Sequence, residues 1–183
     1  MTHWFRLFGL MIGGAILLSG CASTPIPTAS TESRSIVLQH AHTNEVLAST
    51  FWRNQNYDQK AMIDISYFLR DRRVDQVMPI DPKLISLLAD LRDSLGLPQD
   101  YALLVTSGYR SPITNAALRR DNPNVAEHSY HIRGQAMDLK IPGFTPAQVA
   151  DAAKRLGQGG YAWYPHSQHV HVDTGPVRTW RPR

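Results

Sequence analysis

The sequences SYHIRGQAMDLKI at positions 129–141 and HVHVD at positions 169–173 decide the expected fold. Each contains a short run of alternating or apolar residues, so Ala136–Ile141 and His169–Asp173 are predicted to be strands. Gly160–Tyr164 is predicted to be a third strand. Because short strands gather late in the chain without regular β-α-β alternation, the sequence predicts an α+β fold with an antiparallel sheet and flanking helices.

Toward the N-terminus, the chain predicts one hairpin and several helices. The runs Ser35–His42 and Glu45–Phe51 flank a turn and form the predicted hairpin. Tyr57–Arg70 has apolar residues at helical spacing, and Tyr101–Ser107 is rich in strand-forming residues. Three more helices are predicted to begin at a capping residue followed by proline, in the pairs Asp81-Pro82, Ser111-Pro112 and Thr145-Pro146.

Histidines are concentrated in the same late region: five of the eight fall between positions 128 and 171. Neutral histidine is the commonest protein metal ligand, and a catalytic zinc takes three nitrogen or oxygen ligands with one open position. His131 and Asp138 are seven residues apart, and alternation puts His169, His171 and Asp173 on one strand face. The pattern favours a metal site, with ordinary surface or hydrogen-bonded histidines as the alternative.

Three motifs resemble those of known zinc peptidases. The segment 129–138 fits Ser-x-His-x-x-Gly-x-Ala-x-Asp, and HVH fits the His-x-His of zinc D-alanyl-D-alanine peptidases, which share a fold with lysostaphin-type enzymes and the hedgehog signalling domain. SGYRS at 107–111 and GGYAWYPHSQHVHVDTGP at 159–176 complete a closer resemblance to the murein endopeptidase K family. The resemblance covers about residues 35–180 and implies this hedgehog-like fold.

The resemblance also implies roles for individual residues. It places one zinc ion per chain on His131, Asp138 and His171, with His169 as an active-site histidine that does not bind the metal. It places Arg110 near the scissile carbonyl, where a charged donor would stabilise an oxyanion. A structural arginine that satisfies loop carbonyls is the alternative reading of Arg110.

The general base is the open question of the expected mechanism. Zinc would activate a water molecule that attacks the peptide carbonyl, and a base must take its proton and pass it to the leaving amine. Several relatives have an acidic residue three positions before the last zinc ligand, where this chain has Gln168. We therefore expect His169 to act as base or transition-state stabiliser, and Asp173 to orient a histidine or fix its strand.

Other polar and aromatic residues have simpler expected roles. His128 and His166 are not expected to bind the metal. Aromatic side chains near the motif would either line a peptide groove or pack in the core, namely Trp163, Tyr164 and Trp180. The C-terminal arginines are expected to form a solvated tail, namely Arg178, Arg181 and Arg183.

The N-terminal region predicts export and lipidation. Residues 1–20 have a short positive start and an apolar stretch too short to span a bilayer, followed by LLSGC, which resembles a lipoprotein cleavage site. Cys21 is the only cysteine, and lipidation explains it best. The expected organisation is a signal peptide at 1–20, a flexible tether at 21–34 and a zinc metallopeptidase domain at 35–183. By analogy with bacterial lipoproteins, Ala22 in place of Asp favours sorting to the outer membrane, so the periplasmic face of that membrane is the expected location.

Composition narrows the expected partners. The chain has 183 residues, with 19 Lys and Arg against 15 Asp and Glu and no run of five like charges, so nucleic acid is not expected as a partner. We expect a monomeric zinc-dependent murein endopeptidase that hydrolyses peptide cross-links of peptidoglycan. The alternatives are a D,D- or L,D-carboxypeptidase that trims stem peptides, and a non-catalytic zinc-containing lipoprotein that binds peptidoglycan.

Overall fold

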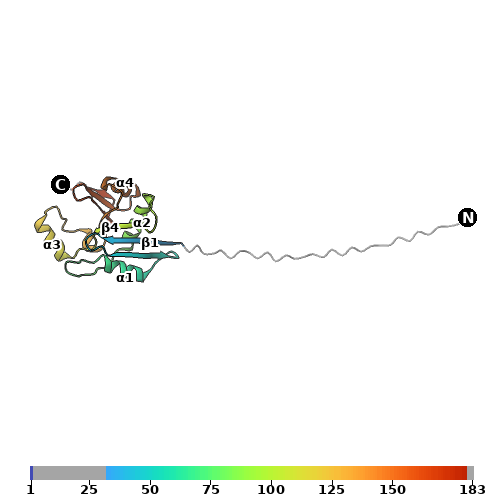
Figure 1. Cartoon of the computed structure of the whole chain (residues 1–183), viewed down its shortest axis with the longest axis horizontal. Coiled ribbons are helices and arrows are strands. Elements are labelled where there is room, and N and C mark those ends of the chain that lie inside the picture. Colours follow the sequence, from blue (N-terminus) through green and yellow to red (C-terminus); the bar gives the residue numbers. More distant parts are fainter. Residues whose placement is uncertain (2–31, 181–183) are drawn as a thin grey trace.

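A computed structural model describes Met1 and residues 32–180, and in this part of the chain the strands form one sheet in the order β3-β2-β1-β4-β5-β7-β6-β8. Figure 1 shows the helices arranged around this sheet. The elements, in chain order, are β1 (Ser33–His40), β2 (Val46–Arg53), β3 (Asn56–Tyr57), α1 (Gln59–Phe68), α2 (Pro82–Ser94), β4 (Ala102–Ser107), α3 (Pro112–Asp121), the 3₁₀ helix η1 (Tyr130–Arg133), β5 (Ala136–Lys140), α4 (Pro146–Leu156), β6 (Gly160–Tyr164), β7 (His169–Asp173) and β8 (Arg178–Thr179).

The α+β class is confirmed, but the sheet is mixed, which corrects the expectation of an antiparallel sheet. β1 pairs with β4 in parallel, and β6 pairs with β8 in parallel. β2 returns the chain to the end of the sheet where β1 begins, because Arg53 pairs with Ser33, and α1 and α2 then connect this end to the start of β4. β8 follows β7 through a turn and therefore runs in the direction of β6. The sequence patterns did not predict β3, η1 or β8.

The three helices predicted from a cap followed by proline begin where expected. The side chains of Asp81, Ser111 and Thr145 each accept a hydrogen bond from a backbone N–H in the first turn of α2, α3 and α4. The proline after each cap occupies a position whose N–H would have no partner inside the helix. These caps fix where each of the three helices begins.

Alternation along β5 and β7 separates the core from the opposite face of the sheet. Met137 and Leu139 of β5, with Val170 and Val172 of β7, are buried in the core to which α2 and α4 contribute. Successive strand residues point to opposite faces, so the polar residues between them share the other face. The face that carries the histidines is therefore held by an apolar core directly behind it.

The short helix η1 is held against the segment before α2 by Gly134. This glycine has φ of +66°, and its carbonyl accepts a hydrogen bond from the Asp81 backbone N–H at 3.0 Å. A Cβ atom at position 134 would lie 2.5 Å from the Pro79 carbonyl oxygen, so only glycine fits. Because η1 carries His131, this close approach positions one of the predicted metal ligands.

The N-terminal predictions fall largely outside the described residues. Cys21, and with it the expected signal peptide after Met1 and the tether as far as residue 31, are not described. In the described part of the chain β1 begins at Ser33, and none of the helices there has the length and apolar character needed to cross a membrane.

We expect Gly134→Ala to lower the free energy of unfolding by at least about 3 kcal/mol. The alanine would be strained in the left-handed backbone conformation, and its Cβ atom would also clash with the Pro79 carbonyl. Gly96→Ala is the matched control, since Gly96 has φ of +71° but nothing within 4 Å of the added Cβ atom. The control should cost about 1–2 kcal/mol. Urea denaturation of both variants measures the difference, and equal losses would contradict this role of Gly134.

Candidate metal centre

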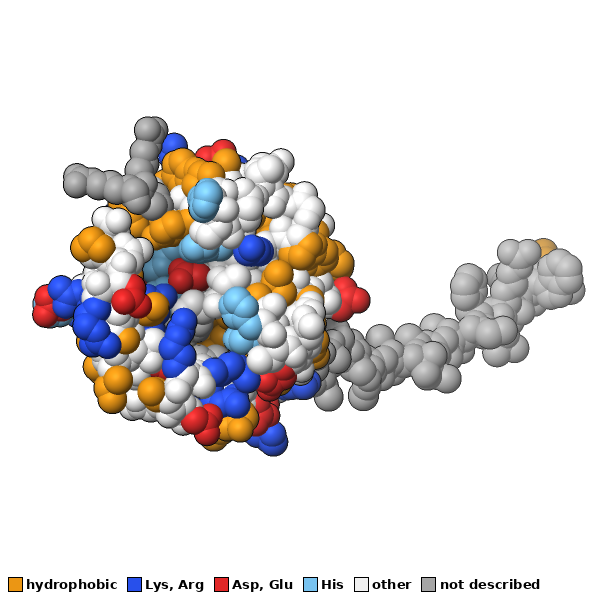
Figure 2. All heavy atoms as spheres, turned by 60° about the vertical axis from the view of Figure 1, so that its left-hand side comes forward, with side chains coloured by type: hydrophobic (Ala, Val, Ile, Leu, Met, Phe, Trp, Pro, Cys, Tyr) orange, Lys and Arg blue, Asp and Glu red, His pale blue; other side chains and the backbone are white. Residues whose placement is uncertain are grey.

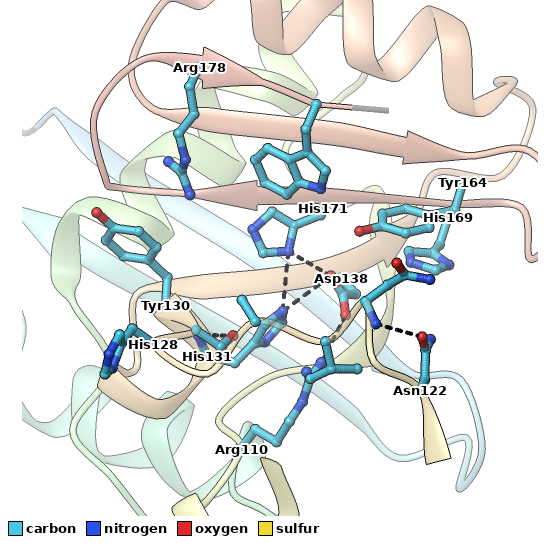
Figure 3. Close-up of a pocket in the computed structure, with 15 residues that line it drawn as sticks. Arg110, Asn122, His128, Tyr130, His131, Asp138, Tyr164, His169, His171 and Arg178 are labelled. Atoms are coloured by element: carbon cyan, nitrogen blue, oxygen red, sulfur yellow. Dashed lines mark hydrogen bonds and ion pairs between the residues drawn. The ribbon is translucent and has the colours of Figure 1, made fainter. Parts of the chain in front are cut away.

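Three side chains from different elements converge on one point. His131 comes from η1, Asp138 from β5 and His171 from β7, where the register places Asp138 directly opposite His171. The His131 Nε2 atom lies 3.2 Å from Asp138 Oδ1 and 3.2 Å from His171 Nδ1, and the last two atoms are 2.9 Å apart. Figure 3 shows the three side chains pointing toward one another. They form the cluster predicted from the sequence.

The outer nitrogen of each histidine is occupied by a hydrogen-bond acceptor. His131 Nδ1 lies 2.7 Å from the Gly108 carbonyl oxygen, and His171 Nε2 lies 2.9 Å from Asp173 Oδ2. Each outer nitrogen therefore carries the proton, which leaves His131 Nε2 and His171 Nδ1 as lone-pair donors toward the common point. Acceptors behind the rings select the tautomers that a metal requires.

The donor set fits a divalent metal ion. Ligands about 2.0–2.1 Å from a tetrahedral zinc lie about 3.3–3.4 Å from one another. The three donor atoms of His131, Asp138 and His171 already lie near that spacing, and all three lie within 4.8 Å of one another. Two imidazole nitrogens and one carboxylate oxygen match catalytic sites that keep a fourth position open.

The electrostatics of the cluster show why a cation would stabilise it. Burial lowers the pKa of His131, whereas hydrogen bonds to Asp138 and Asp173 overcome burial and raise the pKa of His171. Burial alone would raise the pKa of Asp138, but the two histidines hold it well below its usual value. The negative charge of Asp138 is thus stabilised by its neighbours, and a metal ion would compete with protons for the same donor atoms.

Asp173 is the best satisfied carboxylate of the region, although its side chain is completely buried. Besides His171, it accepts hydrogen bonds from both terminal nitrogens of Arg178, at 2.9 and 2.8 Å, and from the backbone N–H groups of Gly160 and Gly175. Burial would raise its pKa, but these donors hold the pKa of Asp173 well below its usual value. The contact with His171 agrees with the expectation that Asp173 orients a histidine.

The interpretation of Arg178 as part of a solvated tail is wrong. Arg178 lies in β8, forms the ion pair with Asp173, and its guanidinium carbon lies 4.8 Å from the Tyr130 ring centroid and 5.0 Å from that of Trp180. The sequence analysis missed this contact because the partner carboxylate lies in β7, which β6 separates from β8 in the sheet. Arg181 and Arg183 fall outside the described residues.

Arg110 lies beside the cluster, on the turn between β4 and α3. Its Nη2 atom donates to Ser107 Oγ and to Asp138 Oδ2, both at 3.2 Å, and its backbone N–H donates to the His131 carbonyl. Its Nε atom is buried and makes no hydrogen bond within the described part of the chain. A charged donor is therefore placed at the wall of the site with hydrogen-bonding capacity left over.

His169 lies next to the cluster but outside the donor set. Its ring stacks on Tyr164 with centroids 4.3 Å apart, and its Nδ1 atom lies 2.9 Å from Ser167 Oγ. Burial lowers the pKa of His169, so the ring is neutral at neutral pH and can accept a proton. Figure 3 shows it on the same side of the sheet as His171.

Gln168 does not take the place of the acid that several zinc peptidases have. It lies in the turn between β6 and β7 with φ of +55°, is exposed, and its amide donates to the Pro165 carbonyl. It is not among the described residues that line the cleft above the cluster.

The cluster lies at the base of a cleft of about 710 Å³. Figure 2 shows the hollow, with histidines and an acidic side chain inside and cationic side chains around it. Tyr164 and Trp180 line the cleft, whereas Trp163 packs against the core, which resolves the alternatives for these aromatics. His166 is exposed in the β6–β7 turn and lies outside the site.

One wall of the cleft escaped the sequence analysis. It is formed by the segment between α3 and η1, which Asn115 anchors by donating to the Ala126 carbonyl at 3.0 Å and the Glu127 carbonyl at 3.4 Å. Polar loop residues have no periodic pattern that would have revealed this wall. The segment contributes Asn122, Asn124, Val125, Ala126 and the exposed His128.

Comparison with known proteins agrees with the geometry. The profile of the family described as peptidoglycan L,D-endopeptidase MepK matches residues 28–180. The chain is 36% identical over 181 residues to the probable peptidoglycan L,D-endopeptidase MepK of Haemophilus influenzae, covering 97% of this chain and 94% of that protein. It is 38% identical over 175 residues to the peptidoglycan L,D-endopeptidase MepK of Escherichia coli K12, covering 93% and 94%.

We expect Asp173→Asn to weaken binding of a divalent metal ion by about 10–100-fold, because the amide can present its N–H to His171 and disturb the tautomer that leaves Nδ1 free. Competition with a chromophoric chelator measures the affinity, and urea denaturation shows whether the variant is folded. Asp151→Asn on the exposed face of α4 is the control. Unchanged affinity in a folded Asp173→Asn protein would contradict this role.

Proposed function

Because this chain belongs to the peptidoglycan L,D-endopeptidase MepK family, we propose that it hydrolyses peptide cross-links of peptidoglycan at L,D-bonds. The observation that carries the proposal is the convergence of His131, Asp138 and His171 at the base of a cleft, with their lone pairs directed to one point. Such a site serves metal-assisted hydrolysis of an amide. The specificity for an L,D-bond rests on the names of the relatives.

The proposed cofactor is one zinc ion held by His131, Asp138 and His171. When bound, the ion would lower the pKa of water and polarise a carbonyl. The near-tetrahedral spacing of the donors and the nitrogen-rich set support zinc over magnesium or calcium, which prefer oxygen ligands. The proposed fold is that of the zinc D-alanyl-D-alanine peptidases and the hedgehog domain.

Arg110 is proposed to stabilise negative charge on the carbonyl oxygen of the scissile bond. Its guanidinium lies at the wall of the cleft, is held by Ser107 and Asp138, and keeps one buried N–H without a partner. A donor that is already fixed costs no reorganisation when the charge develops. The charge of Arg110 is compensated by Asp138 in the described structure, so the cation is tolerated at a mostly buried position.

His169 is proposed to carry the proton from the attacking water to the leaving amine. The ring is neutral because burial lowers its pKa, and Tyr164 and Ser167 hold its plane and its Nδ1 atom. Its other nitrogen, Nε2, is then the group that accepts and returns the proton. Gln168 is exposed and donates to the Pro165 carbonyl, whereas His169 lines the cleft and lies outside the donor set.

Mass spectrometry of cross-linked muropeptide dimers tests the activity. The purified chain in detergent should convert dimers to monomers, and a chelator should abolish the conversion. His131→Ala should lose both zinc and activity, whereas His169→Ala should keep zinc and lose about 10²–10⁴-fold in kcat. Gln168→Ala is the control and should stay within about twofold of the parent, because its side chain faces the turn.

Three outcomes would contradict parts of this proposal. Release of a terminal residue from monomers, with dimers intact, would indicate a carboxypeptidase. Intact substrates with one zinc per chain would indicate a binding protein. Full activity in zinc-loaded His169→Ala would exclude its role as the proton carrier.

We also propose that the chain is a lipoprotein anchored through Cys21 at the periplasmic face of the outer membrane, with the residues up to 34 as signal peptide and tether and the peptidase domain following as a monomer. The support is the LLSGC sequence before the only cysteine. Lipid attachment would hold the enzyme beside its polymeric substrate.

We expect Cys21→Ala to move the protein from the membrane fraction to the soluble fraction, because the thiol that carries the lipid is removed. Immunoblotting of separated cell fractions measures the change. Ser23→Ala is the matched control and should leave the protein in the membrane fraction. A Cys21→Ala protein that stays in the membrane fraction would contradict the anchor.

A further inference from the structure

The polar face of the sheet is organised in rows across β5 and β7. Asp138 pairs with His171 in one row, and the register continues through Leu139 and Val170. The next row on the same face therefore places Lys140 opposite His169. Directly opposed residues in antiparallel strands have Cβ atoms about 4.5–5.5 Å apart. Lys140 and His169 also line the same small recess beside the main cleft.

Lys140 carries a positive charge that nothing in the described structure compensates. Its side chain is partly buried, and its ammonium group makes no ion pair or hydrogen bond within residues 32–180. The two arginines at the cleft are different, because Arg110 is paired with Asp138 and Arg178 with Asp173. Lys140 is thus a partly buried cation without a partner, opposite a histidine that lines the cleft. Such a cation is typical of a group that binds an anionic part of a ligand.

The chemistry of an L,D-bond places a carboxyl group on the leaving side. The leaving amine is attached to a D-configured carbon that also carries a carboxyl group. Where that carbon is the D-centre of meso-diaminopimelate, the amine forms the cross-link and the carboxyl group remains free and ionised. The substrate thus carries a negative charge one carbon away from the nitrogen that must be protonated.

Resting on the proposed function, we infer that Lys140 binds the carboxylate attached to the same carbon as the leaving amine and selects substrates that carry it. The C–N bond breaks beside His169, the oxygen of the attacking water becomes part of the new carboxyl group, and a proton from that water leaves with the amine. Lys140 is the residue opposite His169 in the strand register. When the leaving amine lies at His169, the carboxylate on the same carbon therefore lies beside Lys140. The carboxylate itself is unchanged by the reaction.

Two dimeric substrates test this inference, one with a free carboxyl group at the D-centre and one with the same group amidated. The parent chain should favour the free carboxylate by about 10–100-fold in kcat/KM. Lys140→Met should lose this preference through slower cleavage of the free form, with cleavage of the amidated form unchanged. Lys140→Arg should keep the preference, and Lys83→Met, on the exposed side of α2, should match the parent.

Equilibrium binding gives a second readout that does not require turnover. The zinc-loaded parent chain should bind monomers with the free D-centre carboxylate about tenfold or more tightly than amidated monomers. Lys140→Met should bind the two equally. The inference would be overturned if Lys140→Met kept the parent's preference for the free carboxylate in either assay. It would also be overturned if Lys140→Met slowed cleavage of both substrates equally. A parent chain that distinguishes the monomers but cleaves neither dimer would contradict the proposed function and leave the role of Lys140 supported.

Discussion

The antiparallel pairing of β5 with β7 is the constraint on which the rest of the site depends. It sets Asp138 opposite His171, and the apolar residues between the polar ones are fixed in the core. A shift of one residue would turn every side chain to the other face, so burial of Met137 and Val172 specifies the register. The position of the metal donors thus follows from hydrophobic packing, and His131 is added by a turn that only glycine permits.

Asp173 connects the β5–β7 pair to the C-terminal strand β8. Placing a carboxylate in the interior costs several kcal/mol unless it is fully hydrogen-bonded. Here the guanidinium of Arg178, His171 and two backbone N–H groups supply that compensation. The same bonds hold His171 in the tautomer that leaves Nδ1 free, and they hold β8 against β6. One buried charge therefore stabilises the local fold and orients a metal donor.

Local patterns predicted much of this molecule, and contacts between distant segments account for what they missed. Caps followed by proline located the helices, and alternation located β6 and β7, because both signals act within a few residues. The motif around His131 likewise marked residues that converge in the structure, namely His131 and Asp138. The parallel pairing of β1 with β4 depends on a long connection that no local pattern encodes. The contact of Arg178 with Asp173, five residues away, depends on the turn between β7 and β8. The polar wall from α3 to η1 has no periodicity at all.

The distribution of charge explains how a site without a second acid can serve hydrolysis. Near the donors, Asp138 and Asp173 are each matched by a cation, so the cluster itself has little charge left with which to attract a substrate. The row beside it differs, because it joins a neutral histidine to an uncompensated lysine. Burial, with the charges of His171 and Lys140, lowers the pKa of His169 and keeps it able to accept a proton. The proposed roles in proton transfer and recognition of charge thus fall on one row of the sheet, and two of the proposed metal donors fall on the next.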